Sequence, residues 1–154
     1  MSIYAFKDKN IENWQRPSGL IAMTNGVFDI LHRGHVEYLV EASKKADHLI
    51  VGVNSDSSVR MLGKGPDRPH IGEMDRAFII SQLKAVTDVI IFSEKTPVDL
   101  VGFLKPDVFV KGADYKIEDL PEAEVVFSYG GRVELIDLSK GYSTTSIVSN
   151  IRSS

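Results

Sequence analysis

The alternation of short apolar runs with stretches of helical spacing constrains this chain more than any other feature. Five mostly apolar runs, the candidate strands, lie at residues 20–23, 48–53, 88–92, 107–110 and 132–136. Apolar residues at helical spacing lie between or after them, at 34–46, 73–86 and 97–104, in a short stretch ending at 126, and from 143 onward. Continuous apolar runs suit strands covered on both faces, and this alternation is typical of parallel sheets. The pattern therefore predicts an α/β fold, a single-domain, doubly wound parallel sheet of about five strands.

The length of 154 residues fits one domain. Residues 1–18 are largely polar, with Trp14 and Pro17, and predict an N-terminal lead-in, so we expect the domain to cover residues 19–154. No apolar run approaches the roughly 20 residues of a membrane-spanning helix, so we expect no membrane partner. The chain contains no cysteine, which excludes disulfides and a thiolate nucleophile. Together with a polar N-terminus unlike a signal peptide, this composition favours a cytoplasmic protein.

Polar segments follow the candidate strands at the sheet edge where ligands bind in folds of this kind. They comprise residues 24–35, 54–56, 111–115 and 137–145. The net charge of −3 argues against a nucleic-acid partner but leaves room for a local basic pocket that takes a phosphorylated ligand. The chain has no G-x-G-x-x-G and no G-x-x-x-x-G-K-[ST], which weakens the hypotheses of hydride transfer and of an ordinary P-loop.

His32 and His35 stand three residues apart where a helix begins, so both side chains lie on one face of it. Three interpretations remain open, namely local capping or packing, a pair of metal ligands, and phosphate binding. The i, i+3 spacing and the lack of cysteine weaken the metal interpretation. A helix start offers free N–H groups to phosphate, and two imidazoles would add donors without the permanent charge of arginine.

Two distant motifs resemble a known family. Gly26-Val27-Phe28-Asp29 followed by His32-Arg33-Gly34-His35 is similar to the GxFDxxHxGH signature of the cytidylyltransferase-like nucleotidyltransferases, and Gly141–Thr145 is similar to their second signature. This resemblance implies a Rossmann-like fold. Within the family, the chain resembles the heptose 1-phosphate adenylyltransferases, in the free-standing form without a kinase domain. The stretches that carry this closer resemblance are 24–39, 50–62, 68–69, 110–115 and 141–145.

The resemblance implies transfer of a nucleoside monophosphate from ATP to heptose 1-phosphate, giving ADP-heptose and pyrophosphate for lipopolysaccharide core synthesis. It also implies Mg²⁺ held mainly through phosphates rather than by a protein cage, a homodimer, and a separate sugar kinase upstream. One alternative is a cytidylyltransferase that uses CTP with glycerol 3-phosphate, a phosphonate or another small phosphorylated alcohol. Relatives acting on glycerol phosphate carry an arginine shortly before the second motif. In this chain Lys140 is the only positively charged residue at that place. A further alternative is a non-catalytic nucleotide-binding regulator.

The resemblance also implies roles for individual residues. The expected catalytic residues are His32, His35 and Lys64. The expected nucleotide-binding residues are Asn25, Gly26, Val27, Phe28, Gly34, Arg76, Lys111, Gly112, Asp114, Tyr142, Ser143, Thr144 and Thr145. The expected substrate-binding residues are Asp29, Asn54, Asp56, Arg68 and Tyr115.

Four of these residues also have simpler interpretations that depend on no ligand. The resemblance implies that Asp29 orients its loop or helps hold the metal, and its simpler interpretation is a local turn. Lys64 would be a solvated loop lysine, Arg76 would form a surface ion pair with Glu73, and Ser143 would cap the last helix.

Overall fold

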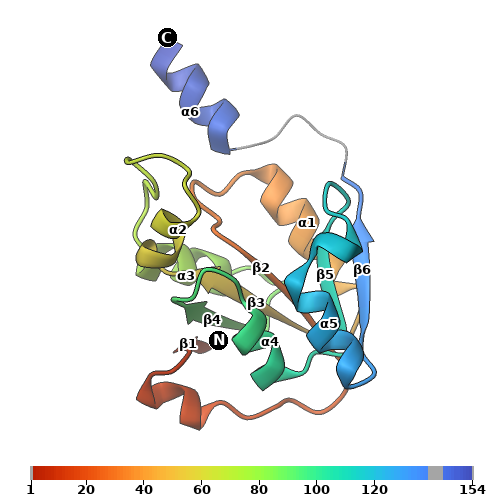
Figure 1. Ribbon diagram of the computed structural model, residues 1–154. Helices are drawn as coiled ribbons and strands as arrows, with labels where there is room; N and C mark the ends of the chain where they lie inside the picture. Colours follow the sequence, from red (N-terminus) through yellow and green to blue (C-terminus); the bar gives the residue numbers. More distant parts are fainter. Residues whose placement is uncertain (1, 139–143, 154) are drawn as a thin grey trace.

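The computed structural model describes residues 2–138 and 144–153, which form one parallel sheet of six strands with helices on both faces (Figure 1). The strand order is β1-β4-β3-β2-β5-β6, and every neighbouring pair is parallel. The bounds are β1 (Ser2–Ala5), β2 (Ile21–Gly26), β3 (His48–Asn54), β4 (Asp88–Phe92), β5 (Val108–Gly112) and β6 (Arg132–Ile136). The predicted doubly wound parallel fold is therefore confirmed.

Six α-helices and two 3₁₀ helices surround the sheet in the described residues. The α-helices are α1 (Arg33–Ser43), α2 (Asp56–Met61), α3 (Glu73–Ser81), α4 (Val98–Leu104), α5 (Pro121–Ser128) and α6 (Thr144–Ser153). The 3₁₀ helices are η1 (Lys9–Asn13) and η2 (Ile117–Asp119). Helices α1 and α3 contribute to one buried apolar cluster, whereas α4 and α5 contribute to the other. The core is thus two layers, one on each face of the sheet.

Strand β2 shows why the apolar runs are continuous. Ile21 and Met23 are buried in the cluster beneath α4 and α5, while Ala22 is buried in the cluster beneath α1 and α3. Successive side chains of a strand point to opposite faces, so a strand covered on both sides needs apolar residues at every position. Strand β2 also lies between β3 and β5, where the order of the strands reverses, and this switch point is where ligands bind in such sheets.

The N-terminal segment departs from the predicted lead-in. Residues 2–5 form the edge strand β1 beside β4, which raises the number of strands to six and extends the sheet to residues before 19. Ile3 packs against one apolar cluster and Tyr4 against the other. Within β1 these are only two neighbouring side chains, which are too few to show a recognisable apolar run.

Trp14 joins this N-terminal segment to the sheet. Its indole N–H donates to Asp88 Oδ2 at 3.1 Å, and its ring lies 6.0 Å from the Phe103 ring, centroid to centroid. We expect Trp14→Ala to lower the free energy of unfolding by about 3 kcal/mol through lost packing. Trp14→Phe keeps an aromatic ring but no N–H donor, and should lower it by about 1 kcal/mol.

The measurement is urea unfolding followed by far-UV circular dichroism. Tryptophan fluorescence is not suitable, because Trp14 is the only tryptophan in the chain and both variants lack it. An unchanged unfolding midpoint in Trp14→Ala would mean that the segment before β2 adds nothing to stability.

Candidate active site

A cavity of about 870 Å³ lies at the carboxyl ends of β2, β5 and β6. It is lined by the start of α1, by the loop between α2 and α3 and by one residue of α6. Fifteen of the predicted residues line it: Asn25, Gly26, Val27, Phe28, Asp29, His32, Gly34, His35, Lys64, Arg68, Lys111, Gly112, Asp114, Tyr115 and Thr145. The predicted Tyr142 and Ser143 lie outside the described residues, as does the side chain of Thr144.

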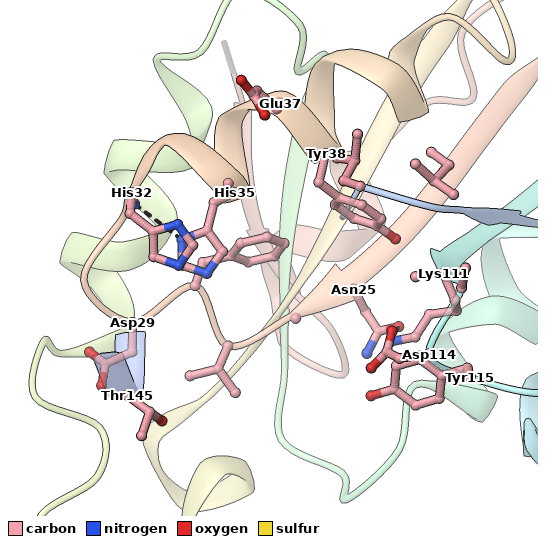
Figure 2. A pocket seen from close by; sticks show the side chains of 18 of the residues that line it. Asn25, Asp29, His32, His35, Glu37, Tyr38, Lys111, Asp114, Tyr115 and Thr145 are labelled. Carbon is pink, nitrogen blue, oxygen red and sulfur yellow. Dashed lines mark hydrogen bonds between the residues drawn. The ribbon is translucent and has the colours of Figure 1, made fainter. Parts of the chain in front are cut away.

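The two histidines lie together at the start of α1, as their spacing predicts (Figure 2). Their rings stack with centroids 3.8 Å apart and planes 20° apart. The backbone N–H of His32 donates to His35 Nδ1 at 3.2 Å. Because Nδ1 accepts this bond, the proton of the neutral His35 ring is on Nε2. The uncharged ring therefore keeps an N–H donor for a ligand.

Burial sets the charge state of both rings. It is the main cause that lowers the pKa of His35 to about 4, with smaller lowering effects from His32 and Lys64 and a raising effect from Asp29. Burial also lowers the pKa of His32. Near pH 7 the pair thus offers neutral donors, and the positive charge on this side of the cavity comes from Lys64 and Arg68.

The loop before α1 requires an unusual backbone. Phe28 and Ile30 have positive φ angles of 52° and 53°, a region that side chains disfavour. A Cβ on Gly26 would lie 2.9 Å from the Phe28 ring, so glycine lets this ring fold back over the end of β2. The Phe28 ring in turn meets the His35 ring edge-on at 5.5 Å. The loop thus supports one side of the histidine pair.

Asp29 connects this loop to the segment before α3. Its side chain is 3% exposed, and its two carboxylate oxygens accept backbone N–H groups of His70 at 2.9 Å and Ile71 at 3.0 Å. These partners lie 41 and 42 residues away, so the carboxylate connects two segments that are distant in the sequence. The geometry supports the expected role of orienting the loop.

Arg76 occupies a different place from the expected one. Its buried guanidinium donates to the carbonyl oxygens of Ile71, Val27 and Asn54, each at 2.8 Å, and to Asp56 Oδ1 at 2.7 Å. It does not line the cavity, in contrast with the phosphate contact that the resemblance implied. These four bonds engage Nε and both terminal nitrogens of the guanidinium, which commits the side chain to this polar cluster.

The alternative surface ion pair between Arg76 and Glu73 is also wrong. Glu73 Oε1 instead accepts the backbone N–H of Asp56 at 3.0 Å. The predicted substrate-binding residues Asn54 and Asp56 lie outside the cavity lining. Asn54 donates to Ser58 Oγ at 2.9 Å, because β3 leads directly into α2 rather than into an open loop.

A second polar group lies across the cavity from the histidines (Figure 2). Lys111 Nζ donates to Asn25 Oδ1 at 3.2 Å and lies 4.6 Å from the centroid of the Tyr115 ring. A Cβ on Gly112 would lie 2.5 Å from Asp114 Oδ1, so glycine lets this carboxylate fold back over the end of β5. This side of the cavity therefore combines a cation with oxygen acceptors and an aromatic face.

Sequence reasoning missed seven residues that line the cavity, namely Glu37, Tyr38, Val59, Ala113, Ile136, Asp137 and Leu138. Tyr38 stands three residues after His35 on the same helix face, which is a signal that could have identified it. Its hydroxyl donates to the Val110 carbonyl at 3.0 Å and lies 2.7 Å from Thr24 Oγ1. Tyr38 thereby fixes α1 against β2 and β5.

The doubly wound sheet, with a histidine pair at the helix start that follows β2, agrees with the nucleotidyltransferase family that the two motifs resemble. Residues 23–150 match the protein family described as cytidylyltransferase-like. The chain belongs to this family, as its two motifs predicted.

Proteins similar to this chain point in the same direction. The bifunctional protein HldE of Syntrophotalea carbinolica is 48% identical over 141 residues, which cover 92% of this chain and 29% of that protein. HldE of Geotalea uraniireducens is 53% identical over 132 residues, which cover 86% of this chain and 27% of that protein. The chain therefore spans less than a third of the length of these relatives.

A crystal structure of a lipopolysaccharide core biosynthesis protein from Thermoplasma volcanium superposes with a TM-score of 0.65. It is 36% identical, and the match covers 82% of this chain and all of that one. Within residues 2–138 and 144–153, no helix has the length and apolar character needed to cross a bilayer.

Arg76 provides a test of the site's framework that does not depend on activity. Arg76→Met should lower the free energy of unfolding by about 4 kcal/mol, because it leaves Asp56 without its charged partner and removes the bonds to three buried or partly buried carbonyls. Arg60→Met, at an exposed position of α2, should change it by less than about 0.5 kcal/mol. Chemical denaturation measures both changes, and equal small effects would show that the Arg76 contacts contribute little.

Proposed function

We propose that the chain transfers the nucleoside monophosphate of ATP to heptose 1-phosphate, giving ADP-heptose and pyrophosphate for lipopolysaccharide core synthesis. The observation that carries this proposal is the pair of neutral, stacked imidazoles at the start of α1, where β2 ends in the cavity. The similarity to HldE and to a lipopolysaccharide core biosynthesis protein supports the heptose acceptor over the glycerol phosphate alternative.

The reaction needs no covalent nucleophile. An oxygen of the sugar phosphate attacks the α-phosphorus of ATP, the new P–O bond forms, and the bond to pyrophosphate breaks. The attacking oxygen is already anionic, so it has no proton to give to a base. The protein's tasks are therefore to hold two anions in line and to stabilise the charge that builds up on the α-phosphate.

His32 and His35 suit the second task. Their N–H donors would contact α-phosphate oxygens beside the free N–H groups at the start of α1. Neutral donors attract the anionic ground state less strongly than fixed cations would, so more of their effect appears where charge accumulates.

Cations near the loop between α2 and α3 suit the first task. Lys64 and Arg68 line the cavity there, and an Arg68 N–H donates to Thr145 Oγ1 of α6 at 3.4 Å. An ion pair of 2.6 Å between Arg152 and Asp67 also links α6 to the loop. We assign the β- and γ-phosphates of ATP to the space between this loop and α6. Lys111, on the opposite side, is then available for the acceptor.

The donor set of the cavity fits Mg²⁺ that is held through phosphates and water. Among the described residues, no group of three or more His, Cys, Asp or Glu side chains gathers into a metal site. Asp29 already accepts two backbone N–H groups, which leaves Asp114 and Asp137 as the other aspartates along the lining. When bound, the ion would supply neutralisation of phosphate charge.

This assignment has consequences for the cellular setting. The resemblance to heptose 1-phosphate adenylyltransferases leads us to propose that a sugar kinase activity upstream supplies the phosphorylated acceptor. We place the reaction in the cytoplasm, where ATP is available, and we keep the homodimer as a proposal that the oligomeric state in solution would test.

Release of pyrophosphate from ATP or CTP, measured with a panel of sugar phosphates and small phosphorylated alcohols, tests the proposed substrates. We expect the highest kcat/KM for ATP with heptose 1-phosphate. Faster turnover of CTP with glycerol 3-phosphate would contradict the proposed substrates and assign the chain to the cytidylyltransferase alternative. Tight nucleotide binding without turnover of any pair would favour a nucleotide-binding regulator.

His35→Ala tests the role of the histidine pair. It should lower kcat by about 100-fold, because it removes one preorganised donor to the transition state. His48→Ala, at the opposite end of the sheet where its Nε2 lies 2.8 Å from Ser18 O, is the matched control and should keep near-normal turnover. A large loss of stability with normal turnover in His35→Ala would assign His35 to packing.

A further inference from the structure

A buried carboxylate outside the cavity lining has no role in the mechanism above. Glu122 is the second residue of α5 and is only 5% exposed. Its Oε2 atom has no hydrogen-bond partner among the described residues. Burying an ionised carboxylate is costly unless a nearby positive charge compensates it. The position of the nearest such charge therefore matters.

The alternation of side chains in the strands places Lys111 on the same face of the sheet as α5. Phe109 is buried in the apolar cluster that contains residues of α4 and α5. Lys111 follows two residues later in β5, so it points to this face as well. Asn25, which accepts from Lys111 Nζ, stands two residues after Met23 of the same cluster. Lys111 thus connects the α5 face to the wall of the cavity.

Charge interactions link the two groups. Burial, the largest effect, lowers the pKa of Lys111 below its ordinary value, and Lys64 lowers it further, while Glu122 and Asp114 act in the opposite direction and raise it. Burial, the largest effect, raises the pKa of the Glu122 carboxyl above its ordinary value, and Lys111 acts in the opposite direction and lowers it. The ring of Tyr115, whose pKa is raised by burial, Asp114 and Glu122, covers Lys111 from the loop after β5. Lys111 is therefore a partly desolvated cation flanked by two carboxylates of different exposure.

We propose that Glu122 is a positioning residue whose buried carboxylate keeps the Lys111 ammonium charged and directed at the anionic substrate on the second side of the cavity. Asp114 lines the cavity and is available to the ligand, whereas Glu122 acts from behind the wall. A counter-charge that does not itself face the substrate supports the lysine without repelling an incoming phosphate. This inference rests on the proposed function for the identity of the substrate only.

A merely structural role for Glu122 makes a different prediction. Glu122 and Glu124 both lie in the first turn of α5, where a carboxylate interacts favourably with the helix start. The backbone N–H of Glu122 itself also stabilises its carboxylate. If helix capping were its whole role, neutralising Glu122 would change stability but leave the titration of Lys111 unaltered. Glu124 is exposed on the same turn, and so provides the matched control.

Trace acetylation with acetic anhydride, followed by mass spectrometry of the peptide that contains Lys111, measures the pKa of this lysine from its rate of labelling against pH. In Glu122→Gln we expect the Lys111 titration to shift to lower pH, because the charge that raises its pKa is gone. In Glu124→Gln it should stay where it is in the unaltered protein. A Lys111 titration that is the same in all three proteins would overturn the proposal.

If the Glu122→Gln protein does not fold, the reciprocal measurement on Glu122 tests the same coupling. In Lys111→Met, the carboxyl carbon of Glu122 followed by NMR should titrate at higher pH than in the unaltered protein, because Lys111 lowers its pKa. An unchanged Glu122 titration would contradict the coupling.

Activity adds a second, separable readout. The alkaline limb of kcat/KM should move to lower pH in Glu122→Gln, and this shift should vanish when the substitution is made in a Lys111→Met background. If the pKa shifts occur but no substrate pair turns over, the proposed reaction fails while the Glu122–Lys111 coupling stands. If turnover occurs without any Lys111 shift, the coupling fails alone.

Discussion

The geometry of the site depends on the buried side chain of Arg76, which does not line the cavity. The guanidinium of Arg76 holds Val27 of the loop before α1, Asn54 at the end of β3 and Ile71 of the segment before α3 through their carbonyl oxygens. Asp29 adds two bonds in the reverse direction, from carboxylate to backbone N–H. These segments lie far apart in sequence, so their relative position is set by this polar core rather than by local geometry. The histidine pair and the Lys64–Arg68 loop face each other because of it.

The local features of the site could be predicted because they are encoded within a few residues. The spacing of His32 and His35 fixes a shared helix face, and Asn25-Gly26 marks the end of a strand. The partners of Arg76 could not be predicted, since helical spacing does not reveal which acceptors an arginine finds 22 and 49 residues away. Strand β1 escaped notice because pairing with β4, not apolar periodicity, makes it a strand. From the sequence alone, Glu122 cannot be told apart from any other carboxylate in the first turn of a helix.

The cavity divides its charges in a way that suits a reaction between two anions. Near the start of α1, burial keeps both imidazoles neutral, and the fixed cations lie at the loop above them. On the opposite side, Lys111 is a single cation that shares its surroundings with Asp114 and an aromatic ring. Two strongly cationic sides would bind both reactants tightly without favouring the transition state. A moderate positive charge on each side, together with the neutral N–H donors of the histidine pair, favours the transition state over the bound reactants.

The same logic explains why the two faces of the sheet contribute differently. Thr24 and Tyr38, on the α1 side, both bond to the Val110 carbonyl and leave no net charge there. One residue further along β2 and β5, Asn25 and Lys111 point to the α5 side and place an amide and an ammonium at the cavity wall. Because neighbouring strand residues alternate between faces, a shift of one residue in either strand would exchange these groups. The parallel register of β2 and β5, paired at Ala22 with Val108 and at Met23 with Phe109, therefore determines the cavity's chemistry as much as its shape.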